Sequence, residues 1–186
     1  MKRITCVTIA MGLVLAACGK DNDDAVANAD VAVATNDMGT ANDMGNAMTT
    51  TADTAFLTDA MKGDNGEVAI GKLAVAQGMS QKAKDFGTML ATEHGAHKDK
   101  VGALLTSAGG MASDEATDEG KANLAKLTPL KGAEFDKAFK AAMIEDHQKD
   151  IAKYEKQAAG SDAATAALAK DTLPTLKKHL ETAKAL

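Results

Sequence analysis

The feature that most constrains this chain is the spacing of its apolar residues, which recur every three to four positions from Asp53 to the end. No stretch shows the strict apolar–polar alternation of a half-buried strand. The pattern predicts an all-α domain over residues 53–186. Each predicted helix has one apolar stripe, and the helices must bury these stripes against one another.

Capping residues and helix breakers divide this region into four long helices and one short helix. We expect the short connections to close the long helices into an antiparallel four-helix bundle, with a longer link at 109–132 that carries the short helix. Pro174 lies inside the last helix and is expected to kink or divide it. The first long helix is expected from Asp53 to Gly78, the second from Ser80 to Gly109, and the short helix from Ser113 to Pro129. The third long helix is expected to end at Gly160, and the fourth to begin at Ser161.

The first residues form a targeting segment. Lys2 and Arg3 precede an apolar run, 4–13, that is too short to span a bilayer. A basic start, a short apolar body and small residues before a cut are typical of a secretory signal. The sequence Leu-Ala-Ala-Cys ending at Cys18 resembles the lipobox of bacterial lipoproteins, in which the cysteine is acylated. We expect a signal peptide at 1–17 and a lipid (palmitate) on Cys18; the alternative is an ordinary signal peptide with an unmodified cysteine.

Residues 18–52 have almost no large apolar side chains and are expected to be a disordered linker. The repeated Asn-Asp-Met-Gly motif makes the segment a low-complexity tether, although its methionines could also bind a soft ion such as Cu(I). Gly19 and Lys20 after the cysteine resemble the signal of lipoproteins sorted to the outer membrane. We therefore expect a cell-envelope protein that is attached to the outer membrane by lipid and faces the periplasm.

Charge and composition argue against nucleic-acid binding. The net charge is −5, and Arg3, which leaves with the signal, is the only arginine in the chain. Phosphate and base recognition rely on clustered positive charge and on the arginine guanidinium. The membrane, contacted through the lipid, is the only partner that the sequence indicates; no protein partner can be named.

All four histidines lie on the predicted stripes. His94 and His147 lie near the middle of their helices, and Glu67 lies about as far into the first helix, ~21 Å from its start. His179 is expected lower, at a height that depends on Pro174. A buried carboxylate is costly unless a cation compensates it, and neutral imidazole suits Zn, Cu, Fe or Ni. The candidate metal ligands are therefore Glu67, His94, His147 and His179, with Zn, Cu or Fe as the expected ion.

These polar residues also have simpler interpretations. Each histidine could be a hydrogen-bonded residue at the edge of its stripe. His97 is either a further ligand or a surface residue. Glu93 and Asp146 each directly precede a histidine and are expected either in water or paired with an imidazole ring. No carboxylate partner for acid–base chemistry is evident for Glu67.

Segments 130–136, 146–148 and 173–180, together with Glu93 and His94, resemble the bacterial family catalogued as domain of unknown function 4142. The resemblance covers 54–186 and implies a ferritin-like four-helix bundle in an envelope protein, with the activity left open. By position, its polar residues are His94, His147 and His179, with Glu67. Ferritin-type di-iron sites place a Glu three residues before a His. No histidine here has one, so that iron chemistry is not expected.

Two functions follow as hypotheses. The first is a lipid-anchored, non-enzymatic envelope protein whose bundle acts as an interaction or stress-associated module. The alternative is a bundle that sequesters a transition metal through its inward histidines and Glu67. No nucleophile setting and no phosphate-binding loop is recognisable, so catalysis is not expected.

Overall fold

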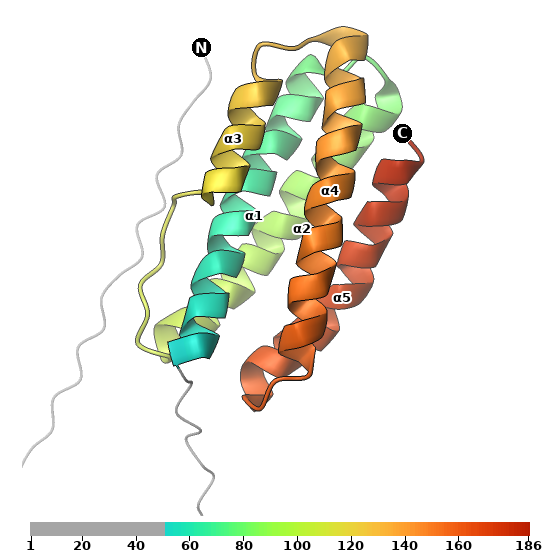
Figure 1. Ribbon diagram of the computed structural model, residues 1–186. Helices are drawn as coiled ribbons and strands as arrows, with labels where there is room; N and C mark the ends of the chain where they lie inside the picture. Colours follow the sequence, from blue (N-terminus) through green and yellow to red (C-terminus); the bar gives the residue numbers. More distant parts are fainter. Residues whose placement is uncertain (1–50) are drawn as a thin grey trace, which may run out of the picture. The chain divides into compact units, whose positions relative to one another are not determined.

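The structure, a computed structural model, describes residues 51–186, which form five α-helices and no β-strand (Figure 1). The prediction of an all-α domain is confirmed for these residues. The predicted signal peptide, Cys18 and most of the predicted linker lie outside them. The helices are α1 (Thr51–Gln77), α2 (Gln81–Ser107), α3 (Asp118–Leu127), α4 (Gly132–Ala158) and α5 (Ala163–Lys184).

The four long helices form two antiparallel hairpins, α1 with α2 and α4 with α5 (Figure 1). The link between the hairpins contains α3 and runs back along α1. It is fixed there by the N–H of Thr117, which donates to the carbonyl of Lys62 at 3.2 Å. In addition, Nδ2 of Asn65 donates to the carbonyl of Ser113 at 2.7 Å. The link therefore covers one side of α1 near its middle.

Because the link traverses the bundle, α4 begins at the same end as α2. Asp136 near the start of α4 accepts hydrogen bonds from the backbone N–H groups of Met79 and Ser80, at 2.9 and 2.8 Å. Helices α2 and α4 consequently run parallel, and the antiparallel arrangement expected for the whole bundle holds within each hairpin.

Three helix starts and one proline differ from expectation. Helix α1 already includes Thr51, so Asp53 lies in its first turn and is not its cap. The short helix begins at Asp118, not Ser113, because Thr117 is its N-cap. The cap of α5 is Asp162, not Ser161, and its side chain accepts from the N–H of Thr165 at 2.8 Å. In both places several capping residues are close together, so composition alone does not select the cap. Pro174 does not divide α5, which is continuous through it.

Helices α1 and α2 approach closely where two glycines face each other. A Cβ atom placed on Gly71 would lie 2.6 Å from the carbonyl oxygen of Gly87, and one on Gly87 would lie 2.6 Å from that of Gly71. Only glycine permits this approach, which brings the middle of α1 against the middle of α2.

The core consists of two apolar clusters. The phenylalanine cluster lies at the end where α2 and α4 begin, and the aliphatic cluster lies at the opposite end. The phenylalanine cluster contains Ile70, Ala74, Ala83, Phe86, Leu90, Leu127, Phe135, Phe139, Ala142, Met143 and Ala183. The aliphatic cluster contains Leu57, Ala60, Met61, Val101, Leu105, Tyr154, Leu168, Ala169 and Leu176.

A layer of polar side chains separates these clusters. On every long helix, the residues of one cluster precede a polar residue and those of the other cluster follow it. We define the polar layer as Asp64, Glu67, His94, His97, His147 and His179. The fold thus holds imidazoles and carboxylates inside the bundle at mid-height.

Candidate metal centre

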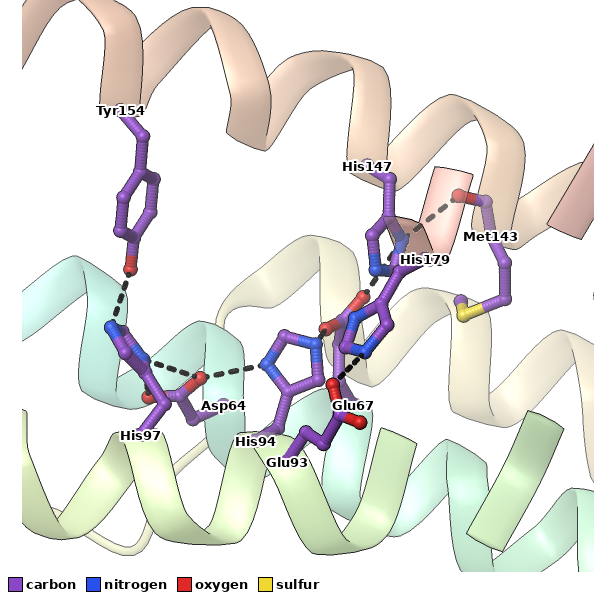
Figure 2. A network of polar contacts seen from close by, with 9 residues as sticks. All are labelled: Asp64, Glu67, Glu93, His94, His97, Met143, His147, Tyr154 and His179. Atoms are coloured by element: carbon purple, nitrogen blue, oxygen red, sulfur yellow. Dashed lines mark hydrogen bonds and ion pairs between the residues drawn. The ribbon is translucent and has the colours of Figure 1, made fainter. Parts of the chain in front are cut away.

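The four predicted ligands lie together in the polar layer, one from each long helix (Figure 2). Glu67 is 2% exposed, His94 6%, and His147 and His179 are 0% exposed. His179, which was expected lower in the bundle, lies at the same level as the other rings, with its centroid 5.2 Å from those of His94 and His147. The described residues thus form a compact, buried His/Glu group.

Each of the three clustered histidines is held by one ring nitrogen. The acceptor is a carboxylate or a carbonyl oxygen, so that nitrogen is the N–H donor and the tautomer of a neutral ring is fixed. Such partners orient imidazoles in metal sites and increase their basicity. The pairs are His94 Nδ1 with Asp64 at 2.9 Å, His147 Nδ1 with the carbonyl of Met143 at 3.0 Å, and His179 Nε2 with Glu93 at 2.8 Å.

The other nitrogen of each ring faces the middle of the group. His147 Nε2 and His179 Nδ1 are buried and have no hydrogen-bond partner, and His94 Nε2 contacts only Glu67. One nitrogen from each of the three rings lies within 4.8 Å of the other two. Buried polar atoms without partners are rare in folded proteins. Here they lie on three rings that are each anchored from behind and that bring one nitrogen apiece to the same place, an arrangement that could hold a metal ion.

Glu67 completes this group. Its Oε2 forms an ion pair with His94 Nε2, its Oε1 lies 3.4 Å from His147 Nδ1, and neither oxygen has a hydrogen-bond partner of normal geometry. Burial alone would raise the pKa of Glu67, but the interactions with His94, and to a smaller extent with His147, outweigh burial and lower the pKa. Without a metal, Glu67 is therefore a carboxylate.

The three rings differ in protonation. Burial opposes a charge on His94, yet Glu67 and Asp64 raise the pKa of His94 well above its usual value. Burial lowers the pKa of His147, and burial together with His94 and His147 lowers the pKa of His179 to about 4. At neutral pH the metal-free group thus holds one imidazolium paired with Glu67 and two neutral rings with free lone pairs.

Asp64 is a member of the layer that was not predicted. It is 3% exposed, and its two oxygens accept from two rings: Oδ1 from His94 and Oδ2 from Nδ1 of His97 at 2.8 Å. Its position three residues before Glu67 on the same helix face was the available signal. His97 lies outside the group of three rings and is not a simple surface residue, because Asp64 accepts from Nδ1 and the hydroxyl of Tyr154 lies 3.5 Å from Nε2.

The two carboxylates that directly precede histidines have separate roles. Glu93 of α2 pairs with His179 across the bundle and not with its neighbour His94. Asp146 turns toward Glu67 and Asp150, and the carboxylate oxygens of these three lie within 4.8 Å of one another. Burial and the charge of Glu67 raise the pKa of Asp146 to about 9. The expectation that Glu67 has no carboxylate partner was therefore wrong.

A cavity of about 210 Å³ adjoins this group between α1, α2, α4 and the link. Its wall includes Glu67 and His94 from the histidine side and Asp146 and Asp150 from the carboxylate side. Water and small ions can therefore come next to Glu67 without displacing the apolar clusters.

Searches of curated proteins and of solved structures found no match for this chain. A family model described as Domain of unknown function (DUF4142) matches residues 38–186, which include all five helices and every residue of the polar layer. The chain therefore belongs to the DUF4142 family.

Proposed function

We propose that this protein binds a divalent transition-metal ion through His94, His147, His179 and Glu67. The observation that carries the proposal is the orientation of the three rings. Each has one nitrogen anchored by a hydrogen bond and the other directed at the middle of the group, where His147 Nε2 and His179 Nδ1 have no hydrogen-bond partner and His94 Nε2 contacts Glu67. A bundle that needed these histidines only for packing would not leave the buried ring nitrogens of His147 and His179 unpaired beside the His94–Glu67 pair.

The chemistry of the ligands favours Zn, Cu or Fe. Imidazole nitrogen suits these ions, and the group contains no thiolate that would favour Cu(I). Three imidazoles and one carboxylate can supply the four ligands of a tetrahedral Zn²⁺ site, with Zn–N distances of ~2.0–2.1 Å. Cu²⁺ binds more tightly than Zn²⁺ to most sites of this kind, so the ion in the cell depends on supply.

Binding of an ion must displace the proton that links His94 to Glu67. Metal ligands have to be deprotonated, and the affinity for the metal therefore decreases as the pH is lowered. His147 and His179 need no such change, because burial already favours their neutral forms. Two of the three rings are thus prepared for a metal before it arrives.

We further propose that the bundle is ferritin-like and works in the cell envelope, attached through a lipid on Cys18. One long connection that traverses the bundle is the arrangement found in ferritin-like folds, and the link with α3 is of this kind. The proposed role is to sequester or hand on a metal, without catalysis. If no metal binds, the remaining proposal is an envelope interaction module. Replacing Cys18 by Ser should move the protein from the membrane fraction to the aqueous fraction.

The test is calorimetric titration of the metal-free full chain with Zn²⁺, Cu²⁺ and Fe²⁺. We expect one tightly bound Zn²⁺ per chain and a loss of more than about 100-fold in affinity for His94→Ala, since changes to second-shell partners alone cost ~10–100-fold. His97→Ala is the matched control, because it removes a histidine of the same helix that also binds Asp64 but has no free nitrogen.

Circular dichroism checks that each variant folds, and His179→Leu repeats the test with a side chain that fills the core. Unchanged binding by His94→Ala and His179→Leu would overturn the proposal. So would equal losses for His94→Ala and His97→Ala.

A further inference from the structure

Three carboxylates meet on the cavity side of Glu67. Glu67 of α1 and Asp146 and Asp150 of α4 bring oxygens within 4.8 Å of one another, and all three line the cavity. Glu67 is paired with the His94 imidazolium on the histidine side, and on the cavity side Lys153 Nζ lies 3.6 Å from Asp150 and 3.0 Å from Asp59. Two aspartate side chains that are partly withdrawn from water beside Glu67 are costly unless a cation compensates them, and Lys153 is shared with Asp59.

A second observation shows that Glu67 has unused ligand capacity. Both of its oxygens are buried and lack hydrogen-bond partners, although the side chain is 2% exposed. The His94 contact uses Oε2, whereas Oε1 has only the 3.4 Å approach to His147 Nδ1, a nitrogen already bonded to the carbonyl of Met143. Oε2 therefore faces the histidine group, and Oε1 is available to a second ion.

We infer that Glu67, Asp146 and Asp150 form a second cation site, which shares Glu67 with the histidine group and takes a hard divalent ion such as Mn²⁺ or Mg²⁺. The inference rests on the proposed function only through this shared carboxylate. Carboxylate oxygens are the ligands that Mg²⁺, Ca²⁺ and Mn²⁺ prefer. The cavity supplies room for the waters that such ions retain.

The two sites would select different ions. The histidine group offers three nitrogens and one oxygen in a closed part of the core, whereas the second site offers three oxygens beside a cavity. Two unlike ions joined by one carboxylate are therefore the expected fully loaded state.

Electron paramagnetic resonance of Mn²⁺ added to the full chain, with and without prior Zn²⁺, tests the inference. Free Mn²⁺ gives a strong signal in water that weakens on binding, so the bound fraction can be measured directly. We expect wild type to bind one Mn²⁺ per chain. The double variant Asp146→Asn with Asp150→Asn should bind Mn²⁺ more than about 100-fold more weakly, and its Zn²⁺ affinity should fall by at most about tenfold, the lower end of the range for second-shell changes.

The matched control is Asp99→Asn with Asp171→Asn, which removes the same charge from two exposed positions on α2 and α5. This control should bind Mn²⁺ as wild type does. Equal Mn²⁺ binding by wild type and by Asp146→Asn with Asp150→Asn would show that the ion is adventitious and would overturn the inference, as would a lack of binding by wild type.

Failure of the two proposals can be told apart. If Zn²⁺ does not bind but Mn²⁺ binds in a manner that needs Asp146 and Asp150, the histidine site is wrong and the second site stands. If Zn²⁺ binds and Mn²⁺ does not, the reverse holds. Glu67→Gln should weaken both ions, and an effect on only one of them would contradict the sharing of Glu67.

Discussion

The apolar clusters and the polar layer between them are built from the same four long helices, but their contacts are of opposite kinds. In the clusters, fully buried side chains such as Phe86, Phe139 and Leu105 gain free energy from leaving water in any well-packed arrangement. In the layer, buried groups such as Glu67 and His94 lose free energy of hydration, and only directed contacts with polar partners compensate this loss.

This difference indicates where stability and function reside. The layer occupies the part of the core where apolar residues would stabilise the bundle most. Its free ring nitrogens bring no benefit to the metal-free fold, and the clusters on both sides must supply the stability that keeps them in place. The predictions below test this separation.

The largest effect is expected in the phenylalanine cluster. Phe135 is fully buried, and its ring stacks on Phe139 with centroids 5.6 Å apart. Phe135→Ala should lower the free energy of unfolding of the metal-free protein by about 3–5 kcal/mol, measured by urea denaturation. The Zn²⁺ affinity of the folded variant should not change. A parallel loss of affinity would mean that cluster and layer are not separable.

Filling the layer with apolar side chains should instead raise the free energy of unfolding of the metal-free protein. The variant with Glu67→Met and with His94, His147 and His179 each replaced by Leu removes the buried Glu67–His94 pair and the unpaired nitrogens together, and Asp64 keeps its contact with His97. Replacement of buried ionic groups by apolar residues of similar volume is commonly neutral or stabilising by 1–4 kcal/mol. We expect the free energy of unfolding of the metal-free variant, measured by thermal denaturation, to increase by about that amount. Added Zn²⁺ should not stabilise the variant. A destabilised variant would show that the layer also supports the fold.

The layer should also make stability depend on pH. The pKa of His179 is lowered from 6.5 to about 4, so between these values the unfolded chain binds more protons than the folded one. The contribution of this ring to stability is therefore full above about pH 6.5 and is lost as the pH falls toward 4. As the pH is lowered through this window, the free energy of unfolding of wild type should fall by up to about 3 kcal/mol relative to that of His179→Leu, as measured by guanidinium denaturation. A difference that is constant with pH would contradict the burial of a neutral ring.

The smallest predicted effect concerns Asp64, which orients two rings without being a ligand. In Asp64→Asn one of the two oxygens becomes an NH₂ group, so either His94 or His97 loses its acceptor. We expect Zn²⁺ to bind about 10–100-fold more weakly, as is typical when second-shell partners are lost. Competition with a coloured chelator measures this change. The exposed Asp99→Asn serves as the control, and an equal effect there would remove Asp64 from the site.

Most of the fold follows from the spacing of apolar residues and breakers. A stripe such as Leu90, His94 and Val101 predicts both a helix and the side of it that faces inward, and the structure contains that helix. The same reasoning placed Glu67, His94 and His147 at one height. It could not place His179 correctly, because the effect of Pro174 on α5 depends on tertiary packing and not on local sequence.

The remaining features depend on how neighbouring helices are rotated. Asp146 and His147 are adjacent in sequence and lie about 100° apart on α4, so whether one or both of them reach Glu67 depends on the position of α1 beside α4. Likewise, Glu93 reaches His179 across the bundle only because α2 and α5 are neighbours. Spacing along one helix contains no information on these pairings. The carboxylate side of Glu67 was missed for this reason.

Each long helix contributes one of the four candidate ligands, and this has a consequence for how the bundle folds. Neither hairpin alone owns more than two of the four groups, so a half-docked folding intermediate could retain an ion only weakly. Sliding any helix by a single residue would shift its donor by 1.5 Å and turn it by about 100°. An ion would thus bind tightly only after all four helices have packed in the correct register. The amount of metal retained would then measure the fraction of chains that are correctly folded.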